Sequence, residues 1–221
     1  MNYYPSFLNL IGKRAVVIGG GGVAERKILT LLKAGARVTV ISPQLTKRIE
    51  KEKRKNNIKH ISRHYRKGDL KNAFIIIAAT DSQAINKHIS EDALCLVNVV
   101  DAPSLCNFIV PSVVKRGPLT IAISTSGVSP AFSKSIRKEL EKLYSSEFSR
   151  YLKFLEKFRK KAVKEIPDKT KRAAFLKSPA SKEIIDMLRR RGFEETKKCV
   201  LSQCKEVVRI DKKSHTKGVK P

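Results

Sequence analysis

Hydrophobic positions in the first half of the chain follow two patterns that alternate along the sequence. Short apolar runs, typical of strands buried in a parallel sheet, are found at residues 14–18, 37–41, 74–79 and 96–100. Helices are predicted at residues 23–34, 50–57 and 82–93, and a weak strand at residues 59–62. Strands that alternate with helices predict an open, largely parallel α/β sheet.

The pattern changes after residue 101. Strands are predicted at residues 108–111 and 119–124. Ser129 and Pro130 then predict the start of a helix that runs to about residue 144, because serine is a good N-cap and proline fits the first helical position. Further helices follow to about residue 205, interrupted at Pro167 and Pro179, and the basic tail lacks periodicity, so we expect it to be disordered.

Composition limits the class of protein and its compartment. With 221 residues and 41% hydrophobic content, the chain can bury a core. No membrane-spanning run or signal-peptide pattern is found, so we expect a cytoplasmic protein. The four cysteines form no CxxC pair, which favours reduced thiols; Cys199 and Cys204 leave ordinary packing and a transient metal contact open.

Charge distinguishes the chain from most proteins of its size. The formal net charge is +27, from 47 basic and 20 acidic residues. Such a charge is typical of proteins that bind nucleic acid or a strongly anionic small substrate. A lysine-rich composition of the source proteome would explain it equally well.

The strongest motif follows the first apolar run. Residues 19–24 read GGGGVA and match the G-x-G-x-x-G/A fingerprint at Gly19, Gly21 and Ala24. Because the motif follows a strand and opens a helix, its backbone N–H groups and the helix dipole are expected to bind a pyrophosphate. A dinucleotide-binding domain of the Rossmann type is favoured over a purely structural glycine turn.

The second apolar run departs from the fingerprint at its end. It closes on Ile41, Ser42 and Pro43, with no acidic residue to hold the adenosine ribose. Ser42 or a nearby backbone group could take that role. Lys47 and Arg48 leave a 2′-phosphate open, so this pattern does not decide between NAD and NADP.

Two aspartates follow apolar strands, at the sheet edge where ligands bind in open α/β sheets. Asp101 closes the run NVVD and is a candidate base, although it could instead cap a turn with Ala102 and Pro103. Asp81 lies at a similar edge or caps the helix that begins near Ser82.

The run STSGVSP joins a strand to a helix N-terminus. Its hydroxyls and backbone donors could hold a carboxylate, and helix capping alone would also explain them. No hydrolase triad, P-loop or zinc-ligand spacing is present, so no metal site is predicted.

These segments together resemble the precorrin-2 dehydrogenase family, which includes the amino-terminal part of bifunctional siroheme synthases. The resemblance covers most of residues 4–141. Its most specific pieces are PSFLNL, GGGGVAERK, AGARVTVISP, AATD, NVVD and NFIVPSVVKRGPLTIAISTSGVSP.

The resemblance implies oxidation of precorrin-2 to sirohydrochlorin with NAD as the hydride acceptor. Asp101 matches the family's catalytic aspartate. Gly22 and Val23 match its dinucleotide-binding turn, and Pro43 and Gln44 match its contacts beyond the second strand. Some members also insert ferrous iron, so a bifunctional dehydrogenase and ferrochelatase is an open alternative.

Further site residues are predicted before and after Asp101 in the sequence. Thr80 is assigned to the cofactor, and Asn107, Ser124, Thr125 and Ser126 to the polycarboxylate substrate. Thr125 stands where some relatives carry serine.

The predicted fold class is thus a Rossmann-type domain, a small dimerisation segment and a helical C-terminal domain. We expect an NAD-binding domain at residues 1–106, a dimerisation segment at 107–147, helices at 148–208 and a disordered tail at 209–221. The family implies a homodimer. A non-catalytic nucleotide-sensing module is an alternative, whereas specific nucleic-acid binding lacks any supporting motif.

Overall fold

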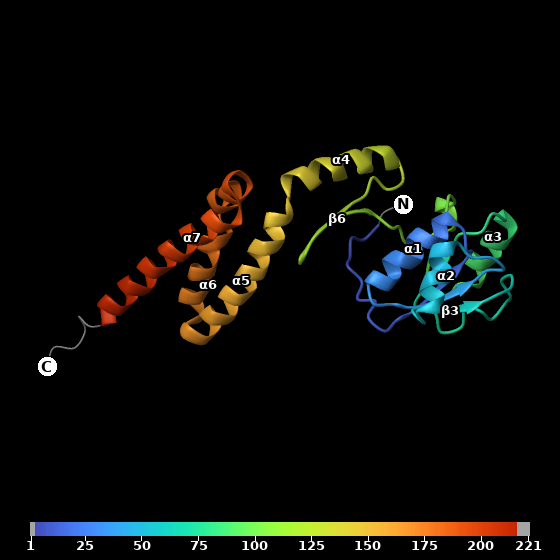
Figure 1. Cartoon of the computed structure of the whole chain (residues 1–221), viewed down its shortest axis with the longest axis horizontal. Helices are drawn as coiled ribbons and strands as arrows, with labels where there is room; N and C mark the ends of the chain where they lie inside the picture. Colours follow the sequence, from blue (N-terminus) through green and yellow to red (C-terminus); the bar gives the residue numbers. More distant parts are fainter. Residues whose placement is uncertain (1–2, 216–221) are drawn as a thin grey trace. The chain divides into compact units, whose positions relative to one another are not determined.

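The computed structural model describes the backbone of residues 3–215 and the side chains of residues 3–203. The chain divides into two compact units, Met1–Val110 and Pro111–Pro221. Figure 1 colours the first from blue to green and the second from green to red.

A five-stranded parallel sheet with helices on its faces forms the first unit (Figure 1). Its strands are β1 (Arg14–Ile18), β2 (Arg37–Ile41), β3 (Ile58–Ile61), β4 (Ile75–Ala78) and β5 (Leu96–Val99), in the spatial order β3-β2-β1-β4-β5. Its helices are α1 (Gly22–Lys33), α2 (Lys47–Arg54) and α3 (Gln83–Asp92). The predicted Rossmann-type architecture is confirmed, and β1 and β2 span the predicted residues.

The two faces of the sheet carry separate apolar clusters. On one face α1 and α2 pack with Ile28 and Ile49 against the strands. On the other face lie α3, through Ile89, and the β3–β4 connection, through Leu70. This connection has no helix, and an ion pair holds it in place.

The ion pair joins Arg63 and Asp69 within the β3–β4 connection. Its two hydrogen bonds run from Nη1 to Oδ2 at 2.8 Å and from Nη2 to Oδ1 at 2.7 Å. The backbone N–H of Arg66 donates to the same carboxylate at 2.8 Å. The hydrogen bonds from Arg63 hold the pKa of Asp69 below its usual range, because they stabilise the ionised form.

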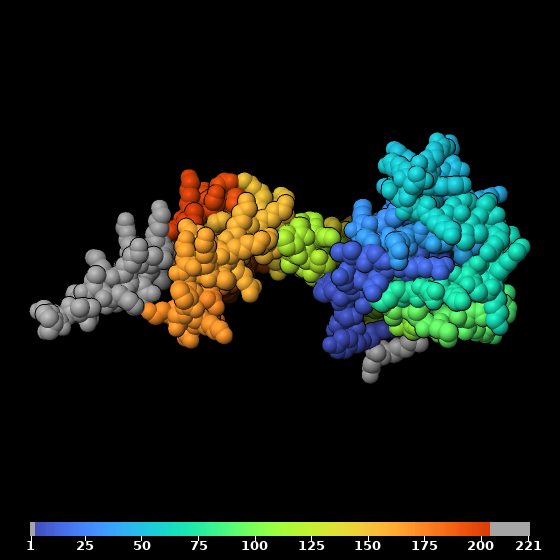
Figure 2. Space-filling model, turned by 90° about the horizontal axis from the view of Figure 1, so that it is seen from below, coloured from blue at the N-terminus to red at the C-terminus, as the bar shows by residue number. Residues whose placement is uncertain are grey.

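The segment before β1 lies on the outside of the first unit, in the darkest blue of Figure 2. The side chains of Tyr4, Phe7 and Ile11 are exposed, whereas Leu10 is buried in the core. These exposed apolar side chains lie in a segment without regular structure.

The second unit begins with a two-stranded antiparallel sheet of β6 (Ser112–Arg116) and β7 (Leu119–Ile123). The prediction of a strand at residues 108–111 is wrong, because β6 starts directly after Pro111. Proline has no N–H to donate to a ladder, and the carbonyl of Phe108 accepts from the Asn98 side chain at 3.2 Å. The apolar run there packs without forming a strand.

Helices make up most of the rest of the second unit as far as the structure describes it, to residue 215. They are α4 (Pro130–Leu143), α5 (Ser146–Glu165), α6 (Lys169–Lys177) and α7 (Lys182–His215). The Ser129 hydroxyl accepts from the Phe132 N–H at 3.2 Å, which confirms the predicted N-cap of α4. Because α7 continues to His215, the disorder expected for residues 209–215 is wrong; the last part of that expectation, residues 216–221, lies outside the described residues.

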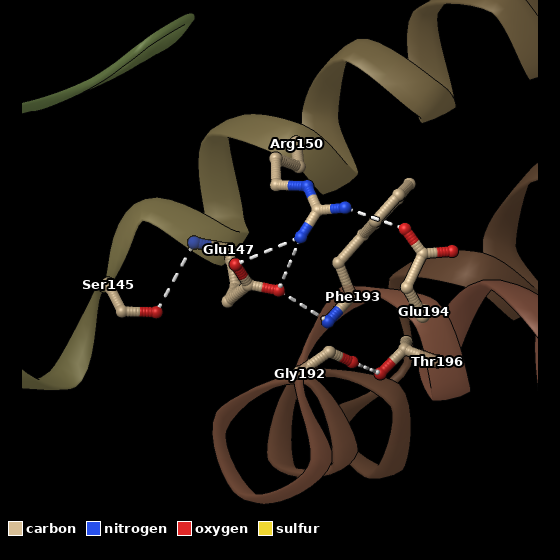
Figure 3. Close-up of polar contacts among 7 residues, drawn as sticks. All are labelled: Ser145, Glu147, Arg150, Gly192, Phe193, Glu194 and Thr196. Carbon is tan, nitrogen blue, oxygen red and sulfur yellow. Dashed lines mark hydrogen bonds and ion pairs between the residues drawn. The ribbon is translucent and has the colours of Figure 1, made fainter.

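The sequence pattern does not predict a break inside α7. Gly192 has a φ of 75°, so two helical segments meet there. The Glu147 carboxylate of α5 accepts from the Phe193 N–H at 2.8 Å and thereby caps the second segment (Figure 3). Arg150 bridges Glu147 to Glu194, with 2.6 Å between its Nη2 and Glu194 Oε1. Sequence alone shows only an interior glycine.

Aromatic and aliphatic side chains of α5 and α7 form the core of the second unit. Cys199 packs against this cluster, which favours ordinary packing over the metal contact; the side chain of Cys204 lies outside the described residues. Within the described part of the chain, no helix is long and apolar enough to cross a membrane.

Candidate active site

The glycine turn after β1 is built by close backbone approach. A Cβ on Gly19, whose φ is 117°, would lie 2.1 Å from the Ala79 carbonyl oxygen. A Cβ on Gly20 would lie 2.0 Å from the Gln44 carbonyl oxygen. Only glycine therefore fits at these two positions, where the turn passes between the ends of β4 and β2.

The next two glycines face open space. Ideal Cβ atoms on Gly21 and Gly22 would meet nothing within 4 Å. Gly21 is the N-cap of α1 and supplies no side-chain hydrogen bond to it. The first N–H groups of α1 thus stay open to a ligand, in the arrangement that binds phosphate groups.

A hollow of about 630 Å³ opens at this carboxyl-terminal edge of the sheet. It is lined by Ile18, Gly19, Gly20, Gly21, Ile41, Ser42, Pro43, Gln44, Leu45, Thr46, His64, Tyr65, Ala79, Thr80, Asp81, Ser82 and Ile85. It therefore brings together most of the predicted cofactor residues. Gly22 and Val23 lie in the adjacent first turn of α1, whereas Ala24 is fully buried against the sheet.

The loop after β2 forms one wall of the hollow. Ser42 is buried, and its hydroxyl donates to the Gln44 carbonyl at 2.7 Å. His60 Nε2 contacts the Ser42 carbonyl at 2.9 Å. These bonds fix the loop and leave the Ser42 hydroxyl as an acceptor.

A glutamate of α1 organises the same wall. Thr46 caps α2, and its hydroxyl also donates to Glu25 Oε2 at 2.6 Å. Arg48 approaches the same carboxylate at 3.9 Å. Neither Lys47 nor Arg48 lines the hollow.

The wall after β4 is held by a buried amide. Asn86 donates to the Thr80 carbonyl at 2.9 Å and accepts from its hydroxyl at 2.8 Å. The N-cap of α3 is Ser82, whose hydroxyl accepts from the Ile85 N–H at 3.3 Å. The capping alternative for Asp81 is therefore wrong, and Asp81 lines the hollow.

Asp101 follows β5 in an unusual backbone conformation. Its φ is 58°, its side chain is exposed, and its carboxylate makes no hydrogen bond or ion pair with any described residue. A side-chain cap on the Ala102–Pro103 turn is therefore wrong. Asp101 does not line the nucleotide hollow itself. Left-handed backbone at a non-glycine residue is concentrated at functional sites.

The segment after Asp101 is tied back to β5. The Asn107 side chain accepts from the Val97 N–H at 2.8 Å and donates to the Cys95 carbonyl at 2.8 Å. The Cys106 thiol accepts from the Val99 N–H at 3.1 Å. Asn107 therefore has a structural role, and its substrate contact stays a prediction.

The predicted substrate residues of the second unit lie in the β7–α4 loop. The Thr125 hydroxyl accepts from the Ser129 N–H at 3.1 Å and lies 3.1 Å from the Ser133 hydroxyl. The Ser124 hydroxyl accepts from the N–H of Ser126, whose φ is 53°. Both hydroxyls shape the loop, and their contact with a substrate stays a prediction.

Family models match nearly all of this region. An NAD(P)-binding model matches residues 6–112, and a model of the central part of the sirohaem biosynthesis protein matches residues 116–143. The siroheme synthase of Thioalkalivibrio sulfidiphilus is 39% identical over 180 residues, which are 79% of this chain and 36% of that protein. The siroheme synthase of Methylobacillus flagellatus is 40% identical over 168 residues, 75% of this chain and 36% of that protein.

A solved structure matches over almost the full length. SirC, precorrin-2 dehydrogenase, has a TM-score of 0.79 and 29% identity, and the match covers 92% of this chain and 100% of that one. The chain belongs to the precorrin-2 dehydrogenase and siroheme synthase family. It spans about a third of the length of its curated siroheme synthase relatives, 36% in both cases.

Membership of this family gives the hollow its ligand class. The NAD(P)-binding match contains the glycine turn and both walls, so the first unit binds a nicotinamide cofactor. The sequence reasoning missed Gly20, whose signal was its place between two other glycines. It also missed His64 and Tyr65, which come from a β3–β4 connection without periodicity.

Tyr65 is fixed at the wall of the hollow. Its hydroxyl donates to Asp92 Oδ2 at 2.7 Å. Burial, followed by this hydrogen bond to Asp92, raises the pKa of Tyr65 above its usual value. Tyr65 therefore stays a neutral donor at physiological pH.

Proposed function

We propose that the chain is an NAD-dependent precorrin-2 dehydrogenase that oxidises precorrin-2 to sirohydrochlorin. The observation that carries this proposal is the uncapped start of α1 beside a hollow of about 630 Å³, within a chain that aligns with the whole of a precorrin-2 dehydrogenase. A sensing module would need the hollow alone.

The residues present fit a dinucleotide. The open space at Gly21 and Gly22 is the space that a Cβ would fill, so phosphate oxygens can reach the N–H groups of α1. Thr80, held by Asn86, and the loop from Ser42 to Gln44 would bound the two ends of the molecule. When bound, the nicotinamide accepts a hydride.

Asp101 is proposed as the base. The oxidation removes two electrons and two protons from the macrocycle, as one hydride and one proton, so a carboxylate must take up the proton. The Asp101 carboxylate is exposed and has no competing partner among the described residues. Its left-handed backbone is fixed by the ties of the following segment to β5.

NAD is proposed over NADP because the cations that follow the β2 loop are not placed to bind a 2′-phosphate. Arg48 lies 3.9 Å from the Glu25 carboxylate, and that carboxylate would repel an added phosphate. Lys47 lies outside the lining of the hollow.

The substrate would be a polycarboxylate, which matches the basic character of the chain. A net charge of +27 favours encounter with a polyanion. The hydroxyls of Ser124, Thr125 and Ser126 remain proposed contacts for its carboxylates.

A cytoplasmic homodimer is proposed as the working form. One face of the two-stranded sheet is covered by helices of its own unit, as the buried Val114 shows. Apolar side chains of the same unit are exposed at Val113, Phe132 and Leu143. These side chains are the proposed subunit contact. The thiols of Cys95, Cys106 and Cys199 are free, as expected in a reducing compartment.

Iron insertion has no separate support. Among the described residues, no group of three or more His, Cys, Asp or Glu side chains gathers to hold a metal ion. Ferrous iron would enter as a substrate, and a transient contact requires no such group.

Initial rates with enzymatically generated precorrin-2 test the proposal. Absorbance of sirohydrochlorin is followed with NAD and with NADP at equal concentrations, and ferrous iron is added in a separate run. A higher rate with NAD is expected. A higher rate with NADP would contradict the cofactor choice, and no turnover with either would contradict the dehydrogenase itself.

A further inference from the structure

A second hollow lies at the opposite, amino-terminal edge of the sheet in the first unit. It has a volume of about 670 Å³ and is lined by the first residues of β1, β2 and β3 and by the turn before β3. Its polar lining includes Arg14, Arg37, Thr39 and Lys59. It is more open to solvent than the hollow at the carboxyl-terminal edge.

Strand register places its polar side chains on one face of the sheet. Arg14 pairs with Arg37 across β1 and β2, and Thr39 pairs with Lys59 across β2 and β3. Since alternate residues of a strand share a face, Arg37 and Thr39 lie on the same side as Ile41. The same side carries the apolar cluster that packs against α3. The polar side chains therefore lie on the α3 side of the sheet, at the starts of the strands.

The three cations of this group have no acidic partner. No carboxylate of a described residue lies within ion-pair distance of Arg14, Arg37 or Lys59. Elsewhere in the same unit Arg48, Arg54 and Arg63 are each paired with an acidic side chain. Two arginines on neighbouring strands repel each other unless an anion lies between them.

Both arginines are held in place by backbone carbonyls. Arg14 donates to the carbonyls of Lys71 and of Asp69, the latter at 3.1 Å. Arg37 Nε donates to the Gly12 carbonyl at 2.8 Å, which leaves its two terminal nitrogens free. The guanidinium groups are therefore fixed before any ligand arrives, which reduces the entropy lost on binding.

Thr39 adds a neutral donor to the lining of the hollow. The residue is 7% exposed, and its hydroxyl makes no hydrogen bond with any described residue. Among the described residues no side-chain nitrogen or oxygen is both fully buried and without a partner, so solvent reaches this hydroxyl. Thr39 lines the hollow, so its hydroxyl can donate to a bound ligand.

We propose that this hollow is an anion site that takes a phosphate group, free or as part of a small phosphorylated molecule. Two fixed guanidinium groups, one ammonium group and one hydroxyl are the donors that recognise a phosphate dianion. The site is distinct from the glycine turn, which lies at the other end of the same strands.

Calorimetric titration with inorganic phosphate at constant ionic strength tests the proposal. Saturating NADH is included, so that the N-terminus of α1 is occupied. The double variant Arg37→Gln with Lys59→Gln removes two cations of the hollow, while Arg14 is kept because it holds the β3–β4 connection. We expect its affinity for phosphate to fall by about tenfold or more.

The matched control is Lys33→Gln with Lys67→Gln. These exposed cations of the first unit do not line the hollow, and their loss changes the net charge equally. We expect an affinity within about twofold of the unmodified chain. Equal weakening in both pairs would show general attraction to a basic surface and would overturn the site, as would the lack of saturable binding.

Two further titrations test the role of the Thr39 hydroxyl and the type of ligand. Thr39→Val keeps the shape of the side chain and all charges, and we expect phosphate affinity to fall by about threefold or more. Unchanged affinity would contradict the role of this hydroxyl. Citrate replaces phosphate in the second titration, and tighter binding of citrate would overturn the assignment to phosphate in favour of a polycarboxylate.

Discussion

The sheet of the first unit carries two hollows of similar volume at its opposite edges, about 630 and 670 Å³, with different chemistry. At the carboxyl-terminal edge the donors are backbone N–H groups beside glycines. At the amino-terminal edge they are the side chains of Arg14, Arg37 and Lys59. Backbone donors require a fixed turn, whereas side-chain donors require only a strand register, so single substitutions should affect the two edges differently.

The largest expected effect lies at the carboxyl-terminal edge, with Asp101→Asn. Asparagine tolerates the left-handed backbone, so the turn is kept while the base is lost. We expect the turnover rate to fall by about 10² to 10⁴, and the Kd for NAD to change by less than about twofold. Rates with precorrin-2 and a fluorescence titration with NAD measure both; normal turnover would remove Asp101 from its role as base.

Substitutions at two glycines distinguish an effect on packing from an effect on ligand binding at the same edge. Gly20→Ala forces a Cβ to within 2.0 Å of a backbone carbonyl, so we expect a loss of about 1–3 kcal/mol in the free energy of unfolding and weaker NAD binding. Gly21→Ala meets no atom within 4 Å, so weaker NAD binding is expected with a smaller loss of stability, below about 1 kcal/mol, because alanine is a poorer N-cap than glycine. Denaturant unfolding and titration with NAD test this pair, and equal loss of stability in both variants would contradict the distinction.

An effect of similar size on stability is expected for Asp69→Asn. Asp69 lies in the β3–β4 connection, whose backbone also contacts Arg14 at the amino-terminal edge. Loss of the charged partner of Arg63 should lower the free energy of unfolding by about 1.5–3 kcal/mol at pH 7. The Asp69 carbonyl also holds Arg14, so a loosened connection should weaken phosphate binding. It should weaken NAD binding as well, because His64 and Tyr65 of the same connection line the nucleotide hollow. Denaturant unfolding and the two titrations measure these changes.

The same ion pair predicts a dependence on pH. The pKa of Asp69 is lowered in the folded state, so its contribution is fully present above the ordinary aspartate pKa of about 3.9 and is lost as the pH falls through the lowered value. The stability difference between the unmodified chain and Asp69→Asn should therefore shrink below about pH 4. A constant difference down to pH 2 would contradict this origin.

The smallest effect is expected for Lys33→Gln with Lys67→Gln. Both side chains are exposed and have no ion pair with a described residue, so the free energy of unfolding should change by less than about 0.5 kcal/mol. A larger change in thermal or denaturant unfolding would mean that removing any two charges from this chain alters the fold, and the comparison between the two edges would need another control.

Sequence patterns predicted those parts of the first unit that depend on local order. β1 and β2 are short apolar runs bounded by glycine or proline, and their limits match the structure. β6 was misplaced, because Phe108 to Val110 are apolar but precede a proline that cannot join the ladder. Periodicity cannot distinguish a partly buried apolar coil from a strand.

The site was only partly predictable for a related reason. Gly19 and Gly21 belong to a local fingerprint, but the need for glycine at position 20 comes from Gln44, which lies on another loop. His64 and Tyr65 reach the hollow through a long connection without a pattern. The arginine pair at the opposite edge depends on register between strands, which a single sequence does not reveal.

The most direct test of the central claim measures NADH and sirohydrochlorin together, in one reaction of the purified chain with precorrin-2 and NAD, after NAD binding has been measured on the same preparation. The account predicts that both products appear in a one-to-one ratio. NAD that binds while neither product forms would contradict the assignment as a dehydrogenase and would leave a nucleotide-sensing module in its place.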